Sequence, residues 1–570
     1  MGICENLNFA HPCAAKASLA FSGALCHTCR RDTRCIDVSN FYPGGVGAGP
    51  SSMSRSKNSK TGGIVILDFG SQFTQLIARR IREFEVYSEI LPWNADKSRI
   101  LSSEPKGIIL SGGPRSTTDP GAPSVDPALL DGTIPVLGIC YGMQLLAKTL
   151  GGKVSKGRLG EYGRTRVHFD EKKLSGINVN IPFDVDVWMS HWDEVESLPD
   201  GAQAFASSES EACAAFSMMD GRIQGLQFHP EVESTEYGRE MLHAFVFDVC
   251  RCEPNWKLGD WVARTTAEIL ETVGDADRVV CGLSGGVDST VSAVLVSKVI
   301  GDRLDCIFVD HGFLRKDEAK QVLEMYKQLN LRVRHVDASE RFLEAVRGVT
   351  NPEQKRKIIG ELFVRVFEEE AARLGGAEWL LQGTISPDVI ESGTASGDVI
   401  KSHHNVGGLP EDMKMKLLEP IRELFKDEVR KIGPLLGIPD HFLKRHPFPG
   451  PGLAVRCLGV LEKERLDALR EADAIFVQEI RDAGLYDEIW QAFCAMLPVR
   501  SVGVAGDVRT YGETVVLRAV ASLDAMTAES VHLPWDLIDR ATKRICGEVP
   551  TVGRVAMDVT GKPPATIEWE

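Results

Sequence analysis

The 570-residue sequence has no apolar run that approaches about 18 residues, so a membrane-spanning helix is excluded. It also has no excess of positive charge, because its formal net charge is −15. That sign is unfavourable for a protein whose main partner is a nucleic-acid backbone. We therefore expect neither a membrane nor a nucleic acid among the partners of this protein.

Cysteine is too sparse for a disulfide-stabilised fold, because only 14 cysteines are spread over the whole chain. A composition of 43% hydrophobic and 25% charged residues is typical of globular enzymes and provides enough apolar side chains for a large core. These features predict reduced thiols and a cytoplasmic location. The length predicts about three or four domains of ordinary size.

The beginning of the chain differs in composition from the rest. Residues 1–60 are basic, and the segment 44–63 is rich in Gly and Ser, which is typical of a flexible linker. Cys26 and Cys29 have the spacing of zinc ligands, but no second pair of this kind accompanies them. We expect a disordered or artefactual extension at residues 1–61. Whether residues 1–52 are a targeting segment, a linker, or lie before a true start at Met53 stays open.

Strands and helices alternate after this extension. Apolar runs predict strands at 64–69, 107–113 and 135–140, and a helix at 74–84. A second alternating region follows, in which residues 279–283 form a predicted strand and residues 290–300 a predicted helix. Such alternation predicts mostly parallel, doubly wound sheets.

Cys140 lies between Gly138 and Gly142, where a predicted strand gives way to a helix. Flanking glycines permit a tight turn that lifts a nucleophile to the helix N-terminus, where the thiolate is favoured. Downstream, His229 and Glu231 follow a short apolar run. Two residues apart on a strand, they would project from one face, so the carboxylate could orient the imidazole that serves Cys140. A buried structural cysteine is the alternative for the five residues around Cys140 taken alone.

A Gly-rich turn, "SGGVDS" at residues 284–289, joins the strand at 279–283 to the helix behind it. Two glycines allow successive N–H groups to point into one concavity, and the helix adds the positive end of its dipole. The Walker pattern GxxxxGK[ST] is missing here, and no lysine follows the glycines. The turn therefore predicts a pyrophosphate site of a different kind. An ordinary strand–turn–helix with a Ser or Asp cap is the alternative.

The "SGGVDS" turn resembles the pyrophosphate loop of the ATP pyrophosphatases, which cut ATP between its α and β phosphates. The resemblance implies that an acceptor oxygen is activated as an adenylate, that Mg²⁺ accompanies ATP, and that no separate metal site exists. The residues to which it assigns ATP binding are Ser284, Gly285, Gly286, Val287, Asp288, Ser289, Val309 and Gly383.

The elbow at Cys140 and the later "HPE" resemble the class I glutamine amidotransferases, over about residues 62–254. The resemblance implies that Cys140 attacks the glutamine amide, that His229 and Glu231 complete a triad, and that ammonia is released. The N–H groups of Gly113 and Tyr141 would stabilise the oxyanion. The segment 189–195 matches a family segment near the glutamine pocket.

Longer segments, including "DHGFLRKDE", "HPFPGPGLAVR" and "GKPPATIEWE", resemble the glutamine-hydrolysing GMP synthetases in order and spacing. This resemblance runs from about residue 62 to residue 570. It implies xanthosine monophosphate as the acceptor, whose 2-oxygen is adenylylated before ammonia displaces AMP. Ala505 departs from those relatives that carry glutamine there, so no role is assigned to it. The implied acceptor-binding residues are Arg315, Arg554, Lys562, Ile567 and Glu568.

Residues 386–408 are polar and Gly-rich, and we expect them to form a mobile lid that keeps water from the activated acceptor. The resemblance places Asp388, Glu391 and Lys401 on this lid, and solvated loop charges are the alternative. At the end of the sequence, two prolines and the alternation over residues 566–569 predict a stiff, strand-like tail.

The predicted protein is an α/β multidomain enzyme and a homodimer that uses ATP, xanthosine monophosphate and glutamine. We expect a class I glutamine amidotransferase α/β domain at residues 62–255. A doubly wound ATP pyrophosphatase domain, like the adenine-nucleotide alpha-hydrolases, is expected at residues 256–445. An α+β dimerisation domain at residues 446–570 would complete the nucleotide pocket.

Three other interpretations are weaker. A glutamine-fed NAD synthetase should carry a nitrilase-type Glu/Lys/Cys site, and the elbow at Cys140 speaks against it. A CTP synthetase shares the amidotransferase half but activates its substrate through the γ-phosphate, which the "SGGVDS" turn does not suit. An inactive scaffolding relative should have lost catalytic positions, and here every expected position is filled.

Overall fold

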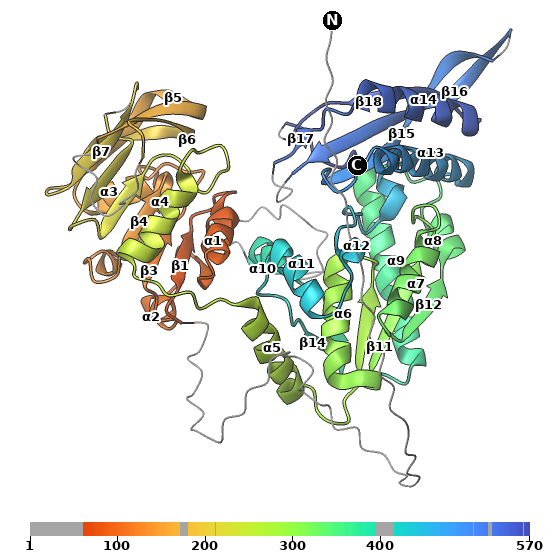
Figure 1. The fold of residues 1–570 in the computed structure, drawn as a ribbon, viewed down its shortest axis with the longest axis horizontal. Helices are drawn as coiled ribbons and strands as arrows, with labels where there is room; N and C mark the ends of the chain where they lie inside the picture. The colour runs from red at the N-terminus through yellow and green to blue at the C-terminus, as the bar shows by residue number, and fades with distance from the viewer. Residues whose placement is uncertain are drawn as a thin grey trace, which may run out of the picture. The chain divides into compact units, whose positions relative to one another are not determined.

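The computed structural model describes residues 61–170, 181–210, 212–393, 415–505, 507–522, 527–562 and 564–570 (Figure 1). The predicted N-terminal extension up to residue 60, with Cys26 and Cys29, lies outside the described residues. So does Lys401 of the predicted lid. The described part of the chain has no helix that is long and apolar enough to cross a membrane.

The first sheet of the described chain has the strand order β2-β1-β3-β4-β9-β8-β7-β5-β6 (Figure 1). The first five strands in this order, β2, β1, β3, β4 and β9, pair in parallel, and the remaining pairs are antiparallel. Every residue of β3 and β4 is buried, as expected for parallel strands covered on both faces. The strands are β1 (Ile64–Asp68), β2 (Ser88–Pro92), β3 (Gly107–Leu110), β4 (Val136–Ile139), β5 (Lys153–Phe169), β6 (Asp184–Ser197), β7 (Gln203–Ser208), β8 (Ala215–Met218) and β9 (Ile223–Leu226).

The helices of this part agree with the predicted alternation. The helix predicted at 74–84 is α1, and the helix behind Cys140 is α3. The full set is α1 (Thr74–Glu83), α2 (Lys97–Leu101), η2 (Pro127–Leu129), α3 (Tyr141–Thr149), α4 (Gly238–Ala244) and η4 (Phe245–Val249).

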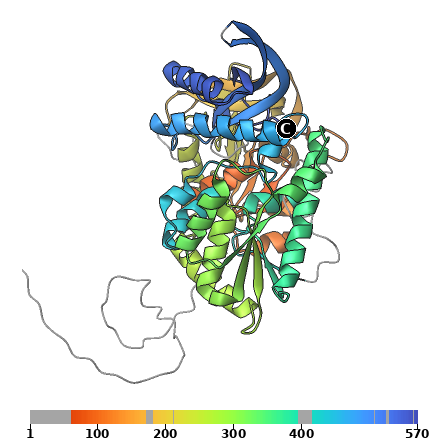
Figure 2. The same cartoon turned by 90° about the vertical axis from the view of Figure 1, so that its right-hand side faces the viewer.

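The second sheet of the described residues is parallel throughout, in the order β12-β11-β10-β13-β14. The order reverses between β10 and β13, so the predicted doubly wound topology is confirmed. Figure 2 shows helices on both faces of this sheet. Its elements are β10 (Val279–Leu283), β11 (Leu304–Asp310), β12 (Val333–Asp337), β13 (Trp379–Leu381), β14 (Lys416–Leu418), α5 (Leu258–Thr272), α6 (Val287–Ile300), η5 (Gly301–Arg303), α7 (Glu318–Gln328), α8 (Ser339–Ala345), α9 (Pro352–Arg373), α10 (Ser386–Gly393), α11 (Lys426–Leu435) and α12 (Asp440–Leu443).

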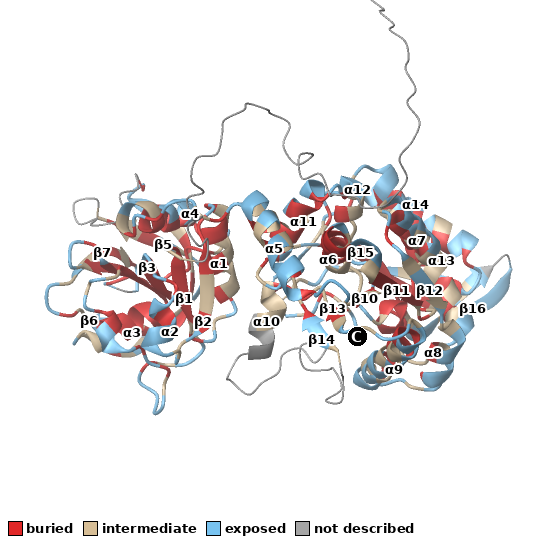
Figure 3. Ribbon diagram, turned by 90° about the horizontal axis from the view of Figure 1, so that it is seen from below, coloured by how far each residue is buried: buried red, intermediate tan, exposed pale blue. Residues whose placement is uncertain are grey.

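Alternating side chains of β10 explain how this sheet is covered. Val279 and Cys281 face a core that includes α5, α6, α7 and α11, whereas Val280 faces a core that includes α8 and α9. Successive side chains of a strand point to opposite faces, so one strand contributes to both cores. The buried residues are concentrated on these strands and on the inner sides of the helices (Figure 3).

The third sheet carries the end of the chain. β15 pairs antiparallel with β16, which also pairs with β17 and, in parallel, with β18. Leu517 and Leu537 of this part lie in the same apolar core as Val280 of the second sheet. The core is therefore continuous across residue 446, where a domain boundary was predicted. The elements are η6 (Gly452–Val455), α13 (Lys463–Asp482), β15 (Gln491–Ala505), β16 (Val508–Ala521), β17 (Glu529–Ser530), α14 (Trp535–Glu548) and β18 (Val552–Asp558).

Three local predictions were wrong. Residues 386–393, expected to begin a loop, form helix α10. Helix α6 begins at Val287, three residues before the predicted start, because the end of the Gly-rich turn already belongs to its first turn. Residues 566–569 form no strand; buried arginines hold this tail instead, as described below. Every cysteine that the structure describes is a free thiol, in agreement with the sequence.

Candidate active sites

Cys140 lies between β4 and α3 in a turn that the flanking residues dictate. Its φ is 52°, an uncommon value for a residue with a side chain. A Cβ atom on Gly138 would come within 2.5 Å of the Gly142 backbone, and one on Gly142 within 2.3 Å of the Leu110 carbonyl. Strand, turn and neighbouring strand can therefore approach this closely only with glycine at both positions. The turn presents Cys140 at the N-terminus of α3.

The sheet brings the other predicted triad residues to the same edge. Strands β4 and β9 are parallel neighbours, so Cys140 and His229 both follow carboxyl ends of adjacent strands. The expectation that His229 and Glu231 lie on a strand was wrong, since β9 ends at Leu226. They lie in the loop that follows, where Nδ1 of His229 and Oε1 of Glu231 are 2.7 Å apart. The Thr235 hydroxyl holds this loop by donating to the His229 carbonyl over 2.6 Å.

Burial and charge set the protonation of His229, whose exposed fraction is 3%. Burial by itself lowers the pKa of His229, but the carboxylate of Glu231 and a hydrogen bond with Cys140 raise it to about 10. An imidazole with this pKa keeps its proton near neutral pH and can pass it to a leaving group. The arrangement suits attack by sulfur on a carbonyl carbon.

Removing the charge of Glu231 should reverse the shift at His229. In Glu231→Gln, desolvation is no longer opposed by a carboxylate, so we expect the pKa of His229 to fall well below about 10. NMR of ¹⁵N-histidine-labelled protein measures it, with His229→Gln to assign the resonance. Glu233→Gln, at a neighbouring exposed acid, is the matched control and should leave the titration unchanged. An unchanged titration in Glu231→Gln would contradict the assigned cause.

The predicted oxyanion donors lie beside the nucleophile. Tyr141 is the first residue of α3, so its N–H is among the amides that have no partner inside the helix. Gly113 follows β3, and a Cβ atom there would lie 2.8 Å from the Phe69 carbonyl and 3.3 Å from the Tyr141 ring. Glycine is therefore needed at this position for the loop to approach the elbow.

The predicted segment near the glutamine pocket, residues 189–195, lies on β6. Its Ser190 carbonyl accepts from the thiol of Cys140 over 3.7 Å. Next to it, the Nε2 atom of His191 lies 3.4 Å from the carboxylate of Glu161 on β5. The antiparallel part of the sheet thus lies beside Cys140, the predicted nucleophile.

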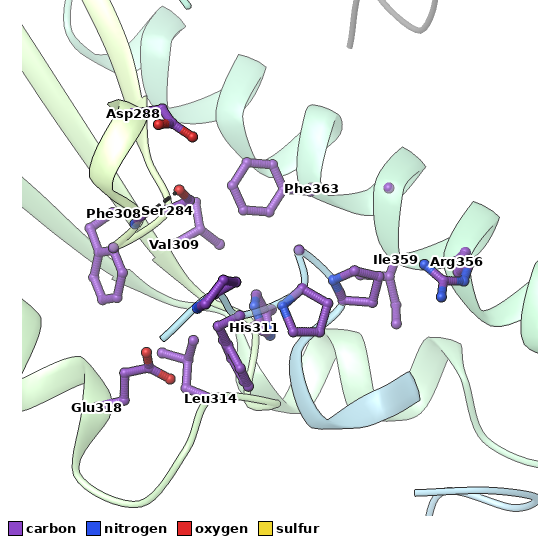
Figure 4. A pocket seen from close by; sticks show the side chains of 18 of the residues that line it. Ser284, Asp288, Phe308, Val309, His311, Leu314, Glu318, Arg356, Ile359 and Phe363 are labelled. Carbon is purple, nitrogen blue, oxygen red and sulfur yellow. Dashed lines mark hydrogen bonds between the residues drawn. The ribbon is translucent and has the colours of Figure 1, made fainter. Parts of the chain in front are cut away.

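The second candidate site is a cavity of about 1110 Å³ at the carboxyl ends of β10 and β11 (Figure 4). Ligands bind in open α/β sheets where the strand order reverses, and this cavity lies beside the reversal between β10 and β13. The "SGGVDS" turn, Val309 of β11 and the 446–451 loop contribute to its lining. Along one side, α9 contributes Arg356, Ile359 and Phe363 (Figure 4).

The Gly-rich turn has a fixed internal geometry. Gly285 has a φ of 78° and donates its N–H to the Tyr326 hydroxyl over 3.0 Å. Gly286 donates to the Ser284 hydroxyl over 3.3 Å, so one amide of the predicted cradle is used inside the turn and the Gly285 amide is used by Tyr326 of α7. The amides at the start of α6, from Val287 onward, remain as donors without intrahelical partners. These amides and the dipole of α6 are the features that would favour an anion at the predicted site.

Asp288 points from the first turn of α6 toward the cavity (Figure 4). Its Oδ2 atom lies 3.5 Å from Nζ of Lys426, at the start of α11. Its Oδ1 atom is buried and has no hydrogen-bond partner among the described residues. A carboxylate oxygen of this kind is a suitable ligand for a hard cation such as Mg²⁺. Arg445 closes the turn from the other side, donating to the Gly285 carbonyl over 3.2 Å.

The remaining predicted ATP-site and lid residues are placed as follows. Gly383 follows β13 and packs on the turn, since a Cβ atom there would lie 3.0 Å from backbone atoms of Asp288 and Ser289. Asp388 lies in the first turn of α10, where its carboxylate accepts from the Ile385 N–H over 3.1 Å. Glu391 lies on the same helix.

Two of the predicted acceptor residues, Arg315 and Glu568, lie near enough to affect each other electrostatically. Glu568 accepts two hydrogen bonds from Arg456, of 2.9 and 2.7 Å, and one of 2.9 Å from Gln491. Burial raises the pKa of Glu568, but Arg456, Gln491 and Arg315 lower it below its ordinary value. The Arg315 and Arg456 guanidinium groups lie 5.2 and 5.1 Å from the ring centre of Phe448, a residue that lines the cavity.

The other predicted acceptor residues lie further out. Arg554 is exposed on β18, and the backbone of Lys562 pairs with Ala528. Neither side chain lines the cavity. Sequence reasoning missed several polar residues that line this cavity or contact Glu568. They are His311, Arg356, Lys426, Arg445, His446, Arg456 and Gln491.

Comparisons with known proteins match three parts of the chain. Residues 65–249 match the family model "Glutamine amidotransferase class-I", residues 262–366 match "NAD synthase", and residues 478–569 match "GMP synthase C terminal domain". The "GMP synthase [glutamine-hydrolyzing]" of Symbiobacterium thermophilum is 55% identical over 511 residues, which are 89% of this chain and 99% of that protein. The protein of the same name from Aquifex aeolicus is 53% identical over 508 residues, with the same coverage of both chains.

The chain belongs to the glutamine-hydrolysing GMP synthase family. The predicted family and fold class are therefore confirmed. The NAD synthase model covers only the region around the "SGGVDS" turn, whereas the models on either side are those of an amidotransferase and of a GMP synthase. The alternative of an NAD synthetase is thus not supported.

Proposed function

We propose that this protein makes GMP from xanthosine monophosphate, ATP and glutamine, in the cytoplasm and without nucleic-acid or membrane partners. The observation that carries the proposal is the presence of two sites on one chain: a thiol elbow with a His–Glu pair, and a phosphate turn beside a large cavity. The volume of this cavity, about 1110 Å³, exceeds the range of about 300–1,000 Å³ common for one small ligand. Two nucleotides that react with each other need such a space.

In the first half of the reaction, Cys140 attacks the side-chain amide carbon of glutamine. His229 transfers a proton to the departing ammonia, and the N–H groups of Gly113 and Tyr141 stabilise the oxyanion. Water then hydrolyses the thioester to glutamate. Glu231 keeps the imidazole oriented through the 2.7 Å contact at Nδ1.

In the second half, the purine 2-oxygen of xanthosine monophosphate attacks the α-phosphorus of ATP, and pyrophosphate leaves. Ammonia then displaces AMP from carbon 2. Phosphoryl chemistry depends on alignment and charge neutralisation more than on covalent help. The amides of α6 and Lys426 supply positive charge next to the turn. The buried Oδ1 atom of Asp288 would hold a Mg²⁺ ion that accompanies ATP, and that ion would supply charge neutralisation at the phosphates.

The acceptor is an anion, and cations surround the region assigned to it. Arg315 and Arg456 lie against Phe448 at the cavity wall, and Glu568 joins them. Lys562 and Arg554 remain proposed phosphate contacts on the outer part of the tail and on β18. Asp388, Glu391 and Lys401 remain the proposed lid residues.

One assay tests the proposed function. Purified protein is incubated with Mg-ATP, glutamine and xanthosine monophosphate, and the products are separated by chromatography. We expect GMP, AMP, pyrophosphate and glutamate. Formation of ADP in place of AMP, or no change in the nucleotides, would refute the proposal.

We further propose that the protein is a homodimer through the hairpin of β15 and β16. Figure 1 shows the far end of this hairpin extending beyond α14. Its side chains Val499, Val504, Val508 and Tyr511 are exposed although they are apolar or aromatic. A cluster of such residues on one hairpin is typical of a protein interface.

A charge on the hairpin should weaken the dimer. We expect Val504→Asp to raise the dimer dissociation constant about thirtyfold, the equivalent of about 2 kcal/mol for a central interface residue. Sedimentation velocity over a concentration series measures it. Val559→Asp, at a similarly exposed valine outside the hairpin, is the control and should sediment like the unchanged protein. A monomeric unchanged protein, or equal dissociation constants, would contradict the proposed interface.

A further inference from the structure

Lys355, on the second turn of α9, is fully buried although lysine is seldom found inside a protein. Its ammonium group donates to the Ala454 carbonyl over 3.4 Å, to the Cys457 carbonyl over 3.0 Å and to Oε2 of Glu570 over 2.6 Å. An ammonium group has three donors, so these three acceptors satisfy it completely. Lys355 therefore joins α9, the turn around η6 and the tail at one point.

Glu570 is held from more than one side. Its Oε1 atom accepts from the Gly459 N–H over 3.2 Å, and the neighbouring Arg356 donates to its main-chain oxygen. Two adjacent residues of α9 thus bind the side chain and the backbone of one tail residue. Arg356 also lines the cavity, so these contacts lie at the cavity's edge (Figure 4).

The rest of the tail is fixed by two other buried cations. Arg518 donates to the Ile567 carbonyl over 2.7 Å and to the Thr566 carbonyl over 2.9 Å, and Arg456 holds Glu568. Both arginines belong to the part of the chain that carries the third sheet, whereas Lys355 belongs to a helix of the second sheet. The Lys355–Glu570 pair is therefore a connection between the tail and the wall of the ATP cavity.

A buried ion pair of this kind is a poor source of stability. Removing two charges from water costs several kcal/mol, and well-packed apolar residues often replace such a pair without loss. The pair instead fixes the position of Glu570, because the ammonium group of Lys355 can donate to all three acceptors in only one arrangement. One residue separates Glu570 from Glu568, so their Cα atoms are at most about 7 Å apart. The position of Glu570 therefore constrains that of Glu568.

We propose that Lys355 and Glu570 are positioning residues that align the acceptor nucleotide, held by the tail, with ATP, held along α9. The inference rests on the proposed function and assigns residues that would touch neither nucleotide. In-line attack on the α-phosphorus requires the two substrates to be placed within a fraction of an ångström, and they are held by different parts of the chain. A loosened tail still binds ATP, but it holds the acceptor nucleotide more weakly, misaligns it and admits water to the activated acceptor.

The test uses full-length Lys355→Met/Glu570→Leu, which removes both charges and leaves neither unpaired. Glu570→Gln is the second variant, because it keeps the shape of the side chain if the double variant folds poorly. With ammonium as nitrogen source, we expect the KM for xanthosine monophosphate to rise about tenfold or more, and the KM for ATP to change by less than about twofold. Pyrophosphate should exceed GMP among the products, because part of the activated acceptor is hydrolysed.

Lys153→Met/Glu196→Leu is the matched control. It removes an exposed Lys–Glu pair of the same 2.6 Å length, on β5 and β6 of the first sheet. It should keep both KM values and equal amounts of pyrophosphate and GMP. A merely structural role would lower the active fraction without changing the product ratio. If the unchanged protein forms GMP and both variants keep the acceptor KM and the ratio, the positioning role is overturned alone. If the unchanged protein forms no GMP, the proposed function fails and the inference with it.

Discussion

Replacing Cys140 by alanine should lower glutamine-dependent GMP formation about 10⁴-fold or more, because the nucleophile of the amidotransferase half is lost. Synthesis from ammonium salts should stay within about twofold of the unchanged protein, since ammonia added from solution bypasses that half. Both rates are measured from AMP release with saturating ATP and xanthosine monophosphate. The φ of 52° at Cys140 is strained for any residue with a Cβ atom, so alanine should add no backbone strain beyond that which cysteine already has.

Cys213→Ala is the matched control for this result. Cys213 has the same exposed fraction as Cys140, 5%, and lies in the same part of the chain, but it lies just before β8 and its thiol donates to the Ala215 carbonyl over 3.7 Å. It should retain both activities. An equal loss of glutamine-dependent and ammonium-dependent synthesis in folded Cys140→Ala would show that the thiol is not a separate ammonia source.

The elements that the sequence predicted best are those whose chemistry is local. The elbow at Cys140 needs glycine two residues before and after it, for steric reasons that hold in any parallel sheet. The turn at residues 284–289 needs glycine where φ is positive. Such requirements can be recognised from a few adjacent residues of the sequence. The doubly wound order followed from the alternation of strands and helices in the same way.

The residues that were missed come from distant parts of the chain. Lys426 reaches Asp288 from α11, and Gln491 reaches Glu568 from β15. A lysine at the start of an amphipathic helix has the pattern of an ordinary solvent-facing residue, so no spacing indicated its role. The buried Lys355 was missed for the same reason, since α9 contains several other charged residues.

The wrong predictions show where local patterns give an incomplete picture. The tail at residues 566–569 alternates as a strand would, yet its carbonyl groups are taken by Arg518 rather than by a neighbouring strand. The stiffness that the prolines suggested is present, but buried arginines provide it. His229 and Glu231 meet because the loop after β9 folds back, held by Thr235, and not because a strand aligns them.

Asp288→Asn should lower pyrophosphate release about a hundredfold, the usual effect of losing one strong electrostatic contributor. The amide is isosteric with the carboxylate, so the turn and α6 should keep their geometry. What changes is charge: the buried Oδ1 atom, which has no hydrogen-bond partner among the described residues, no longer offers a negative ligand to Mg²⁺. Lys426, at 3.5 Å from Oδ2, would also lose its counter charge and bind phosphate differently.

The experiment separates this role from a structural one. Asp302→Asn, at an exposed position of η5 just after the far end of α6, is the matched control and should release pyrophosphate at the unchanged rate. Glutaminase activity at Cys140 should survive in both variants, because the thiol elbow lies on another sheet. Raising the Mg²⁺ concentration should recover part of the activity of Asp288→Asn if the lost carboxylate is a cation ligand. Pyrophosphate release at the unchanged rate, with no dependence on added Mg²⁺, would remove Asp288 from the mechanism and leave the amides of α6 as the phosphate site.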